Sequence, residues 1–450
     1  MFYQAQLSPR LYRFFSREFW YVIAYLVISV FVFSYFFRHP QNVMGDNSHY
    51  LSLSSALMDK NFDVLHFDFE MRTYVHPTYL ALARMPAKFL GLSQIHSIYL
   101  FNFVLLLLAN YFIYLRVRTF DRVVARAFLI VSSLNVFTLS FANTNLTENT
   151  SIFFTALLFY FLTGKDTAVK LFGAGVTAGL FMYTRPSAIV LFFVVLLLVI
   201  GRGIFQRKIK RTLFFFIGAV LPISVGMLNT YNLDQRVALF TTRTQGIYEM
   251  QVANGPQWIK YETSADRNLK YQQLFYTHPR NDKFIELQCK GTVGCILTYF
   301  KTYPVDYVLS LGHHVFNIFD RVYVYNYVTD LEGRGVLLSF INYFMLTAVF
   351  IGGLFFTYSK QWLASLGVVA VIAFGLLSIY IPTIVEPRFS APLYPFIFMV
   401  FCYYLVQMYK SSDRALKVRI LFLQISFVVM CFLLSDMVSI TVINGTERVY

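Results

Sequence analysis

The sequence predicts an all-α protein that crosses a membrane many times. Of its 450 residues, 57% are hydrophobic and only 14% are charged, which is typical of a polytopic membrane protein rather than a soluble domain. Apolar runs recur along the chain between short polar turns. In a bilayer each span must pair its own backbone groups, which a helix does within one segment. We therefore expect a single transmembrane domain over residues 1–450.

Eleven apolar runs approach or reach the length of about 17–25 residues that crosses a bilayer. Several runs in the middle of the chain are short, so their ends are approximate. The runs are Phe19–Phe37, Ser97–Leu115, Ala127–Phe141, Thr150–Leu162, Val169–Tyr183, Ala188–Ile200, Thr212–Asn229, Gly335–Thr357, Trp362–Ile381, Leu393–Met408 and Ile420–Ile440. This pattern predicts a bundle of about eleven spans.

Positive charge alternates along the predicted spans. The N-terminal segment carries arginines, and every second connection after it is basic. Basic connections stay on the cytoplasmic side, so the N-terminus should be cytoplasmic and the tail 444–450 outside. These connections account for the net charge of +15. A nucleic-acid partner is not expected, because the chain has no long basic arm, zinc-binding spacing or RNA-binding motif.

Two of the predicted outside loops are long. The loop 38–96 contains two short amphipathic helices joined by Asn61–Tyr74, and the loop 230–334 is polar. Within the second loop, Pro304–Phe319 has the pattern of a helix lying along the membrane surface. Cys289 and Cys295 also lie there. They would form a small disulfide in an oxidising compartment, or be two unpaired loop cysteines.

The stretch Met44–Tyr50 follows the first apolar run almost at once and contains Asp46. A carboxylate at the edge of a span can keep its charge while partly desolvated, which suits a catalytic base. The alternative is that Asp46 caps a short surface helix over Ser48–Asp59.

Other ionisable residues lie in short outside turns at the rims of spans, where they are costly and tend to be functional. Glu148 precedes the fourth run and could instead cap the fourth helix, where the helix dipole favours a negative charge. Arg185 precedes the sixth run and could instead reach lipid headgroups. Glu386 and Arg388 share a proline-rich turn and could simply pair with each other.

These side chains suggest a lipid phosphate as substrate. Arginine binds phosphate in a bidentate manner, and the prolines around Arg388 stiffen its turn. A carboxylate would take the proton of an acceptor hydroxyl, while the arginines stabilise the leaving phosphate. The chain has no P-loop, dinucleotide-binding fingerprint or G-x-S-x-G elbow.

At these positions the chain resembles the GT-C superfamily of membrane glycosyltransferases, which includes the protein O-mannosyltransferases and the lipid A aminoarabinose transferase. The similar segments occur in the order expected for the family and fall on one predicted side. They are Gly45-Asp46-x-x-x-Tyr50, His76-Pro77-Thr78-Tyr79-Leu80, the acidic turn with Glu148, and Thr184-Arg185-Pro186 with the later Glu386-Pro387-Arg388-Phe389.

The resemblance implies a polyprenyl-phosphate or polyprenyl-diphosphate sugar donor and, in general, inversion at the sugar. It implies that Asp46 is the catalytic aspartate and that Arg185 and Arg388 contact the donor phosphate. Two positions depart from the family pattern: Asn47 replaces the usual second acid and Thr78 a common glycine. Family members differ in metal use, so a divalent metal is one alternative and metal-free transfer the other.

We therefore expect an inverting glycosyltransferase in a bacterial inner membrane, with its active site outside. It would move one sugar to an acceptor hydroxyl on an envelope glycan such as lipopolysaccharide or O-antigen, with a protein as the alternative acceptor. The competing hypotheses are an O-antigen polymerase or ligase that uses a diphosphate-linked glycan, and a lipid-linked sugar transporter. Predicted catalytic residues are Asp46 and Glu148, predicted phosphate contacts are Arg185 and Arg388, and candidate acceptor or auxiliary residues are His49, Tyr50, Asp68, Glu70, His76 and Glu386.

Overall fold

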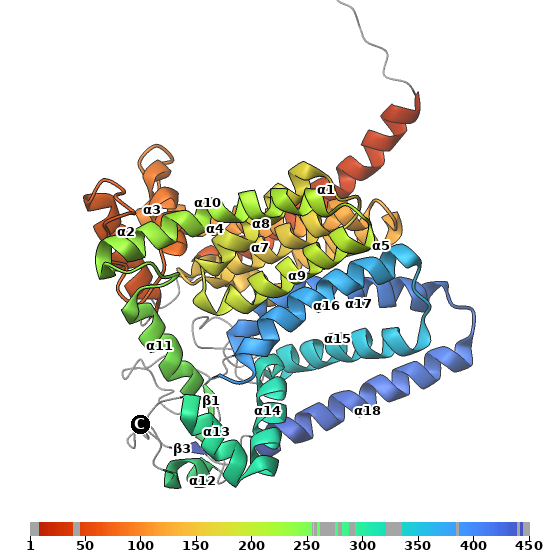
Figure 1. The fold of residues 1–450 in the computed structure, drawn as a ribbon. Helices are drawn as coiled ribbons and strands as arrows, with labels where there is room; N and C mark the ends of the chain where they lie inside the picture. Colours follow the sequence, from red (N-terminus) through yellow and green to blue (C-terminus); the bar gives the residue numbers. More distant parts are fainter. Residues whose placement is uncertain are drawn as a thin grey trace, which may run out of the picture.

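Long helices run side by side through most of the molecule and are joined at its two ends (Figure 1). The computed structural model describes residues 9–38, 46–253, 255, 259–261, 275–277, 281–287, 293–320, 335–383, 387–438 and 442–443. The prediction of an all-α polytopic membrane protein is confirmed.

The first half of the chain supplies most of the bundle. Its elements are α1 (Pro9–Arg38), α2 (Asp46–Asp59), α3 (Val75–Arg84), η1 (Met85–Ala87), α4 (Gln94–Val117), α5 (Arg122–Ser133), α6 (Val136–Leu139), η2 (Ser140–Asn143), α7 (Glu148–Leu162), α8 (Ala168–Met182), η3 (Pro186–Ala188), α9 (Ile189–Phe205) and α10 (Ile209–Asp234).

The second half begins with short elements and ends with four long helices. Its elements are α11 (Thr242–Ala253), β1 (Ile259–Tyr261), β2 (Phe275–Thr277), α12 (Asn281–Glu286), α13 (Val293–Thr302), α14 (Pro304–Phe319), α15 (Gly335–Phe355), α16 (Lys360–Tyr380), η5 (Pro387–Leu393), α17 (Tyr394–Lys410), α18 (Arg414–Val438) and β3 (Val442–Ile443). The three short strands form an antiparallel sheet in the order β1-β2-β3.

Each of the predicted apolar runs overlaps one or more helices of the structure. Within the described residues, 8 helices are long and apolar enough to cross a membrane. The third predicted run corresponds to α5 followed by α6 and η2, which bend by 52° relative to α5. The fourth and fifth correspond to the shorter apolar helices α7 and α8. A multi-pass membrane protein is thus supported, whereas the number of eleven spans remains a prediction.

Helices α8 and α10 approach each other closely because glycines face the contact. A Cβ on Gly175 of α8 would lie 2.0 Å from the carbonyl oxygen of Phe215, and one on Gly218 of α10 would lie 2.2 Å from that of Phe172. Small residues of this kind allow membrane helices to pack backbone against backbone. Tyr183, which follows α8 two residues before Arg185, packs against Gly226 of α10, so this contact supports the turn that carries Arg185.

The C-terminal helices attach to this bundle mainly through α16, α17 and the turn between them. Helix α16 packs on α9, and α17 packs on α5, while α15 and α18 lie farther out, beside each other. Figure 1 shows α16 and α17 between the first bundle and the pair α15 and α18. The turn between α16 and α17 contains η5 and packs on the start of α7.

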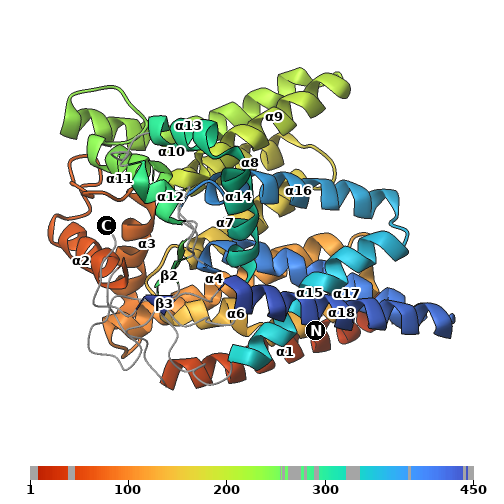
Figure 2. The same ribbon diagram turned by 90° about the horizontal axis from the view of Figure 1, so that it is seen from below.

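Shorter elements gather at one end of the bundle. The predicted pair of helices in the first long loop is present as α2 and α3, and α11 lies beside them in both views (Figures 1 and 2). The expected helix Pro304–Phe319 is α14, with the predicted bounds. It runs across the ends of the long helices rather than along them. Several helix ends from distant parts of the sequence therefore meet here.

Candidate active site

A cavity of about 280 Å³ opens at this end, between α2, η3, α11, the end of α16 and η5. The charged side chains that line it are Asp46, Arg72, Arg185 and Arg388. Around them lie polar and aromatic side chains, including Tyr50, Thr147, Thr244, Tyr248, Gln251, Tyr380 and Phe389. The cavity thus combines a carboxylate and three guanidinium groups with aromatic walls, which suits an anionic ligand with a ring.

Asp46 is the first residue of α2, and its carboxylate contacts two arginines. Arg72 Nη2 donates to Oδ1 at 2.5 Å, and Arg388 Nη2 donates to Oδ2 at 3.0 Å. Asp46 and Arg388 are 342 residues apart in the sequence. Burial by itself would raise the pKa of Asp46, but the charges and hydrogen bonds of Arg388 and Arg72 outweigh it and lower the pKa to about 2. Asp46 is therefore ionised near neutral pH.

Arg185 lies in the turn between α8 and η3. Because Pro186 follows, its backbone is extended (φ −139°, ψ 115°), and this directs the side chain into the cavity wall. The guanidinium lies 5.3 Å from the ring centroid of Tyr380 and 4.8 Å from that of Phe389. Arg185 Nη1 also donates to Glu148 Oε1 at 3.3 Å. Aromatic rings and one carboxylate therefore hold this guanidinium in place.

Glu148 lies behind the arginines rather than in the cavity wall. It begins α7, where the helix dipole favours a negative charge, and it is 0% exposed. Its Oε1 lies 3.3 Å from Arg185 Nη1 and 3.9 Å from Arg388 Nε. Since one carboxylate oxygen faces both guanidinium groups, Glu148 holds the two predicted phosphate contacts together.

A buried polar network fixes the start of α2 against the turn before α7. Asn47 Oδ1 accepts a hydrogen bond from the backbone N–H of Asn145 at 2.8 Å. His76 Nε2 donates to the carbonyl oxygen of Asn145 at 2.8 Å. The His76 ring meets Tyr50 edge-on at 4.8 Å between centroids, and burial lowers its pKa to about 4. Asn47, which replaces an acid in the family pattern, is therefore used to join the two segments.

The remaining predicted auxiliary residues fall in different places. Tyr50 lines the cavity, but His49, Asp68 and Glu70 do not. His49 Nε2 lies 3.1 Å from Glu70 Oε2, and Asp68 Oδ2 accepts from Arg243 Nη1 at 2.8 Å, both near the surface. Asp68 and Glu70 are thus not among the residues that line the cavity with Asp46, and their role as a second acid stays a prediction.

Two predictions concern residues outside the described part of the chain. Glu386 precedes η5 in the sequence and Cys289 precedes α13, and neither residue is described. The pairing of Cys289 with Cys295 therefore stays untested. Cys295 itself is buried with Phe284 and Tyr299.

Sequence reasoning missed Arg72 and the contribution of α11. Arg72 lies between α2 and α3 in the predicted outside loop, where basic residues are less expected, and that was the one signal available. The residues of α11 carried no signal, because Thr244, Tyr248 and Gln251 look like ordinary loop residues until the helix packs over the cavity.

Metal ligands do not gather in the described segments. No group of three or more His, Cys, Asp or Glu side chains is placed there to hold an ion. The acids and histidines of the site are instead next to arginines, amides and other polar groups.

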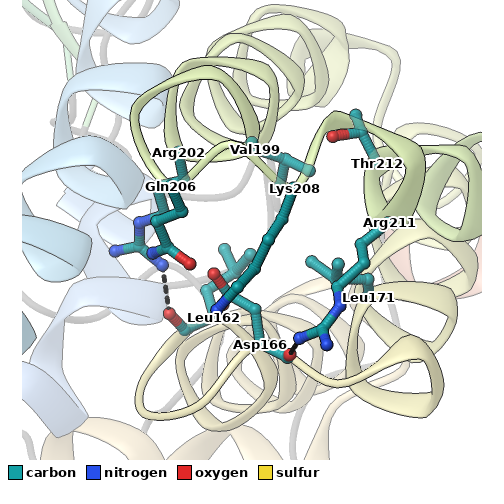
Figure 3. A pocket seen from close by; sticks show the side chains of 10 residues that line it. Leu162, Asp166, Leu171, Val199, Arg202, Gln206, Lys208, Arg211 and Thr212 are labelled. Atoms are coloured by element: carbon teal, nitrogen blue, oxygen red, sulfur yellow. Dashed lines mark hydrogen bonds between the residues drawn. The ribbon is translucent and has the colours of Figure 1, made fainter.

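A much smaller crevice lies at the end of the bundle opposite the cavity (Figure 1), and Figure 3 shows the side chains that line it. It is bounded by the α7–α8 and α9–α10 turns, and its volume is about 10 Å³, room for about one water molecule. Arg202 donates to the carbonyl of Leu162, and Arg211 donates to the carbonyl of Asp166. Its size excludes a sugar or a phosphate from its interior. The cavity with Asp46 is the candidate active site because of its volume and its charged lining.

Comparison with known proteins finds one family that resembles the central part of the chain. Residues 76–228 match the family described as dolichyl-phosphate-mannose-protein mannosyltransferase, which is part of the GT-C superfamily. The GT-C resemblance is confirmed. The GT-C region reaches from α3 to α10 and includes Glu148 and Arg185. Searches of curated proteins and of solved structures find no match.

The GT-C match also bears on the chemistry of the cavity. It supports a membrane glycosyltransferase that takes its sugar from a polyprenyl-phosphate donor. Asp46, Arg72 and Arg388 lie outside the matched residues, but they line the same cavity as Arg185. The matched and unmatched parts of the chain therefore build one site.

Proposed function

We propose that this protein moves a single sugar from a polyprenyl-phosphate carrier to an acceptor hydroxyl, with inversion at the sugar carbon. One observation carries the proposal: Asp46 and Arg388, from turns far apart in the sequence, touch each other in a cavity that Arg185 also lines. A base next to phosphate-binding groups is what sugar transfer from a phosphate requires.

Asp46 is the base of the proposed reaction. Its carboxylate takes the proton of the acceptor hydroxyl, and the hydroxyl oxygen attacks the anomeric carbon from the face opposite the phosphate. The bond between that carbon and the phosphate oxygen breaks, and its electron pair stays on the phosphate. Arg185 and Arg388 stabilise the second negative charge that the phosphate acquires.

Formal charge supports a monophosphate donor over a diphosphate donor. The site holds Arg72, Arg185 and Arg388 with Asp46 and Glu148, so one positive charge is in excess. A sugar–phosphate diester carries one negative charge and balances the site. After transfer the phosphate carries nearly two, but Asp46 has become neutral, so the balance persists. A diphosphate-linked glycan, as used by the competing polymerase or ligase, would add a further negative charge to a buried site.

The remaining site residues support rather than perform the transfer in this proposal. Glu148, predicted above as catalytic, keeps Arg185 and Arg388 together from behind. Tyr50 faces the cavity and can contact the acceptor or the sugar. His49 and Glu70 lie near the surface outside its wall. His76 holds the turn before α7.

We also propose a bacterial inner membrane as the location, with the N-terminus in the cytoplasm and the cavity outside. The basic turns support this orientation, because they lie at the end of the bundle opposite the cavity. They connect α4 to α5, α7 to α8, α9 to α10, α15 to α16 and α17 to α18. Strand β3 pairs with β2, so residues 442–443 lie next to the loop 230–334. This agrees with the prediction that the C-terminal tail and this loop are on the same side of the membrane. An envelope glycan such as lipopolysaccharide or O-antigen is the proposed acceptor, because the described loops at the cavity form no large domain that could read a folded protein.

Mass spectrometry of lipid bound to the purified protein tests the proposal. We expect a polyprenyl carrier with one phosphate, and we expect that sugar to appear on an acceptor when the loaded protein meets envelope glycans. A carrier with a diphosphate-linked glycan would favour the polymerase or ligase. Movement of the intact lipid-linked sugar across a vesicle membrane, without a transfer product, would favour the transporter.

A further inference from the structure

The carboxylate of Asp46 is engaged on both oxygens. Arg72 binds Oδ1 and Arg388 binds Oδ2, and Tyr50 lies beside Arg72. Arg185 and Glu148 form the neighbouring pair of charges. A base that must accept a proton from a hydroxyl needs a lone pair directed at that hydroxyl. Each oxygen keeps a second lone pair, but two guanidinium groups stabilise the negative charge of Asp46, so a carboxylate held in this way is a weak base.

The surroundings of Arg72 allow its guanidinium to exchange one anionic partner for another. It comes from the irregular segment between α2 and α3, and its backbone carbonyl accepts a hydrogen bond from Thr244 Oγ1 of α11 at 3.3 Å. The guanidinium carbon lies 4.9 Å from the ring centroid of Tyr50. Its Nε is buried and has no hydrogen-bond partner among the described residues. The backbone of Arg72 is held in place, and its side chain has an N–H donor to spare. The guanidinium can therefore bind a second ligand.

Because the donor phosphate is negatively charged, moving Arg72 from Asp46 to the phosphate should change the free energy little. Arg72 would pass from a carboxylate to a phosphate oxygen, and both bonds are charge-assisted. The guanidinium would stay paired throughout, which avoids the cost of a buried unpaired charge. Arg388 differs, because Glu148 Oε1 lies 3.9 Å from its Nε and holds it from the other side. Arg72 is therefore the partner that Asp46 can lose.

We propose that Arg72 is a positioning residue that restrains Asp46 before the donor binds and turns to the donor phosphate when the carrier lipid arrives, which frees one carboxylate oxygen for the acceptor hydroxyl. The inference rests on the proposed function. It makes the base available only after the donor is in place, so the donor binds before a productive acceptor does.

Carbodiimide labelling of carboxyl groups tests this exchange, because the reagent reacts with the protonated acid. The purified protein is labelled near pH 5 in the presence of a tracer amine, with and without undecaprenyl phosphate, and Asp46 is quantified by peptide mass spectrometry. Loss of one arginine raises the pKa of Asp46, and each unit increases the protonated fraction about tenfold. We expect labelling of Asp46 to rise about tenfold when the lipid binds, and Arg72→Gln to show that rise without lipid.

Arg243→Gln is the matched control, because Arg243 pairs with Asp68 in an exposed contact outside the cavity. It should leave the labelling of Asp46 unchanged, with and without the lipid. Lipid binding is measured in the same samples. If the lipid binds and labelling of Asp46 stays constant or falls, the exchange is wrong while the proposed function stands. If undecaprenyl phosphate does not bind to the wild-type protein at all, the proposed function itself fails.

Discussion

The two carboxyl groups of the site differ because their surroundings differ. Asp46 lines the cavity and is bound by Arg72 and Arg388, whereas Glu148 is fully buried behind Arg185 and Arg388. A carboxylate that reaches the cavity can meet a substrate proton, and one behind the arginines acts through them. The proposed roles, base for Asp46 and arginine positioning for Glu148, rest on this difference.

The base assignment is tested by Asp46→Asn. The amide keeps the size of the side chain but cannot accept the proton, so sugar transfer should fall about 10²–10⁴-fold. The protein should still insert and bind the carrier lipid, because Arg185 and Arg388 remain. Transfer is followed with radiolabelled donor, and lipid binding serves as the control. Turnover equal to that of the wild type would end the assignment.

Arg388→Ala is expected to weaken binding of the carrier lipid more than binding of the acceptor. A hydrogen bond to a charged group contributes about 1.5–3 kcal/mol, so the dissociation constant of the lipid should rise about 10–100-fold. Arg388→Lys should recover part of this loss, since it keeps the charge but not the planar fork. A larger effect on the acceptor than on the lipid would contradict the role in phosphate binding.

His76 makes folding stability depend on pH. Burial lowers its pKa from 6.5 to about 4, so between these values the unfolded chain binds a proton that the folded chain does not. The free energy of unfolding should therefore fall as the pH drops from about 6.5 to 4, by about 3 kcal/mol at most. Thermal unfolding in detergent across this range measures the slope. His76→Gln should flatten it, and an unchanged slope in that variant would assign the effect to other groups.

At the scale of elements, the contact between α8 and α10 supports the turn that carries Arg185. It depends on backbone proximity at Gly175 and Gly218, where a Cβ would lie 2.0 and 2.2 Å from carbonyl oxygens. Such distances cannot be relieved by rotating a side chain, because the opposing atom belongs to the backbone. The helices would have to separate.

Gly175→Ala should therefore destabilise the protein, by about 1–3 kcal/mol as for overpacked cores. Gly367 of α16 provides the matched control, because a Cβ there meets no atom within 4 Å. Gly367→Ala should be neutral or stabilise its helix by up to about 1 kcal/mol. Thermal unfolding of both variants in the same detergent decides the point. Equal melting temperatures would show that α8 and α10 can separate without cost.

At the scale of the whole molecule, the cavity and the basic turns occupy opposite ends of the bundle. This separation fits a protein that binds its donor on one side of the membrane and keeps its basic turns on the other. It also brings turns from both halves of the chain to one cavity. The GT-C region alone, residues 76–228, lacks Asp46, Arg72 and Arg388.

The proposed orientation is tested by single cysteines at two exposed lysines in a variant lacking the four native cysteines. Lys88 follows η1 at the cavity end, and Lys360 begins α16 at the other end. In intact bacterial cells, a membrane-impermeant thiol reagent should label Lys88→Cys but label Lys360→Cys only after lysis. The opposite pattern would invert the orientation and place the cavity in the cytoplasm.

The sequence by itself determined the membrane-spanning class, the apolar runs and the turns at which Asp46, Arg185 and Arg388 lie. These properties are local, because the length of an apolar run and the charge of the next turn decide where a helix crosses the bilayer. Tertiary structure decided which turns meet. The bonds of Asp46 with Arg72 and Arg388, the use of Asn47 to hold Asn145, the position of Glu148 behind the arginines and the cover provided by α11 all join segments far apart in sequence. Such contacts depend on how the helices pack, and no local pattern of residues encodes them.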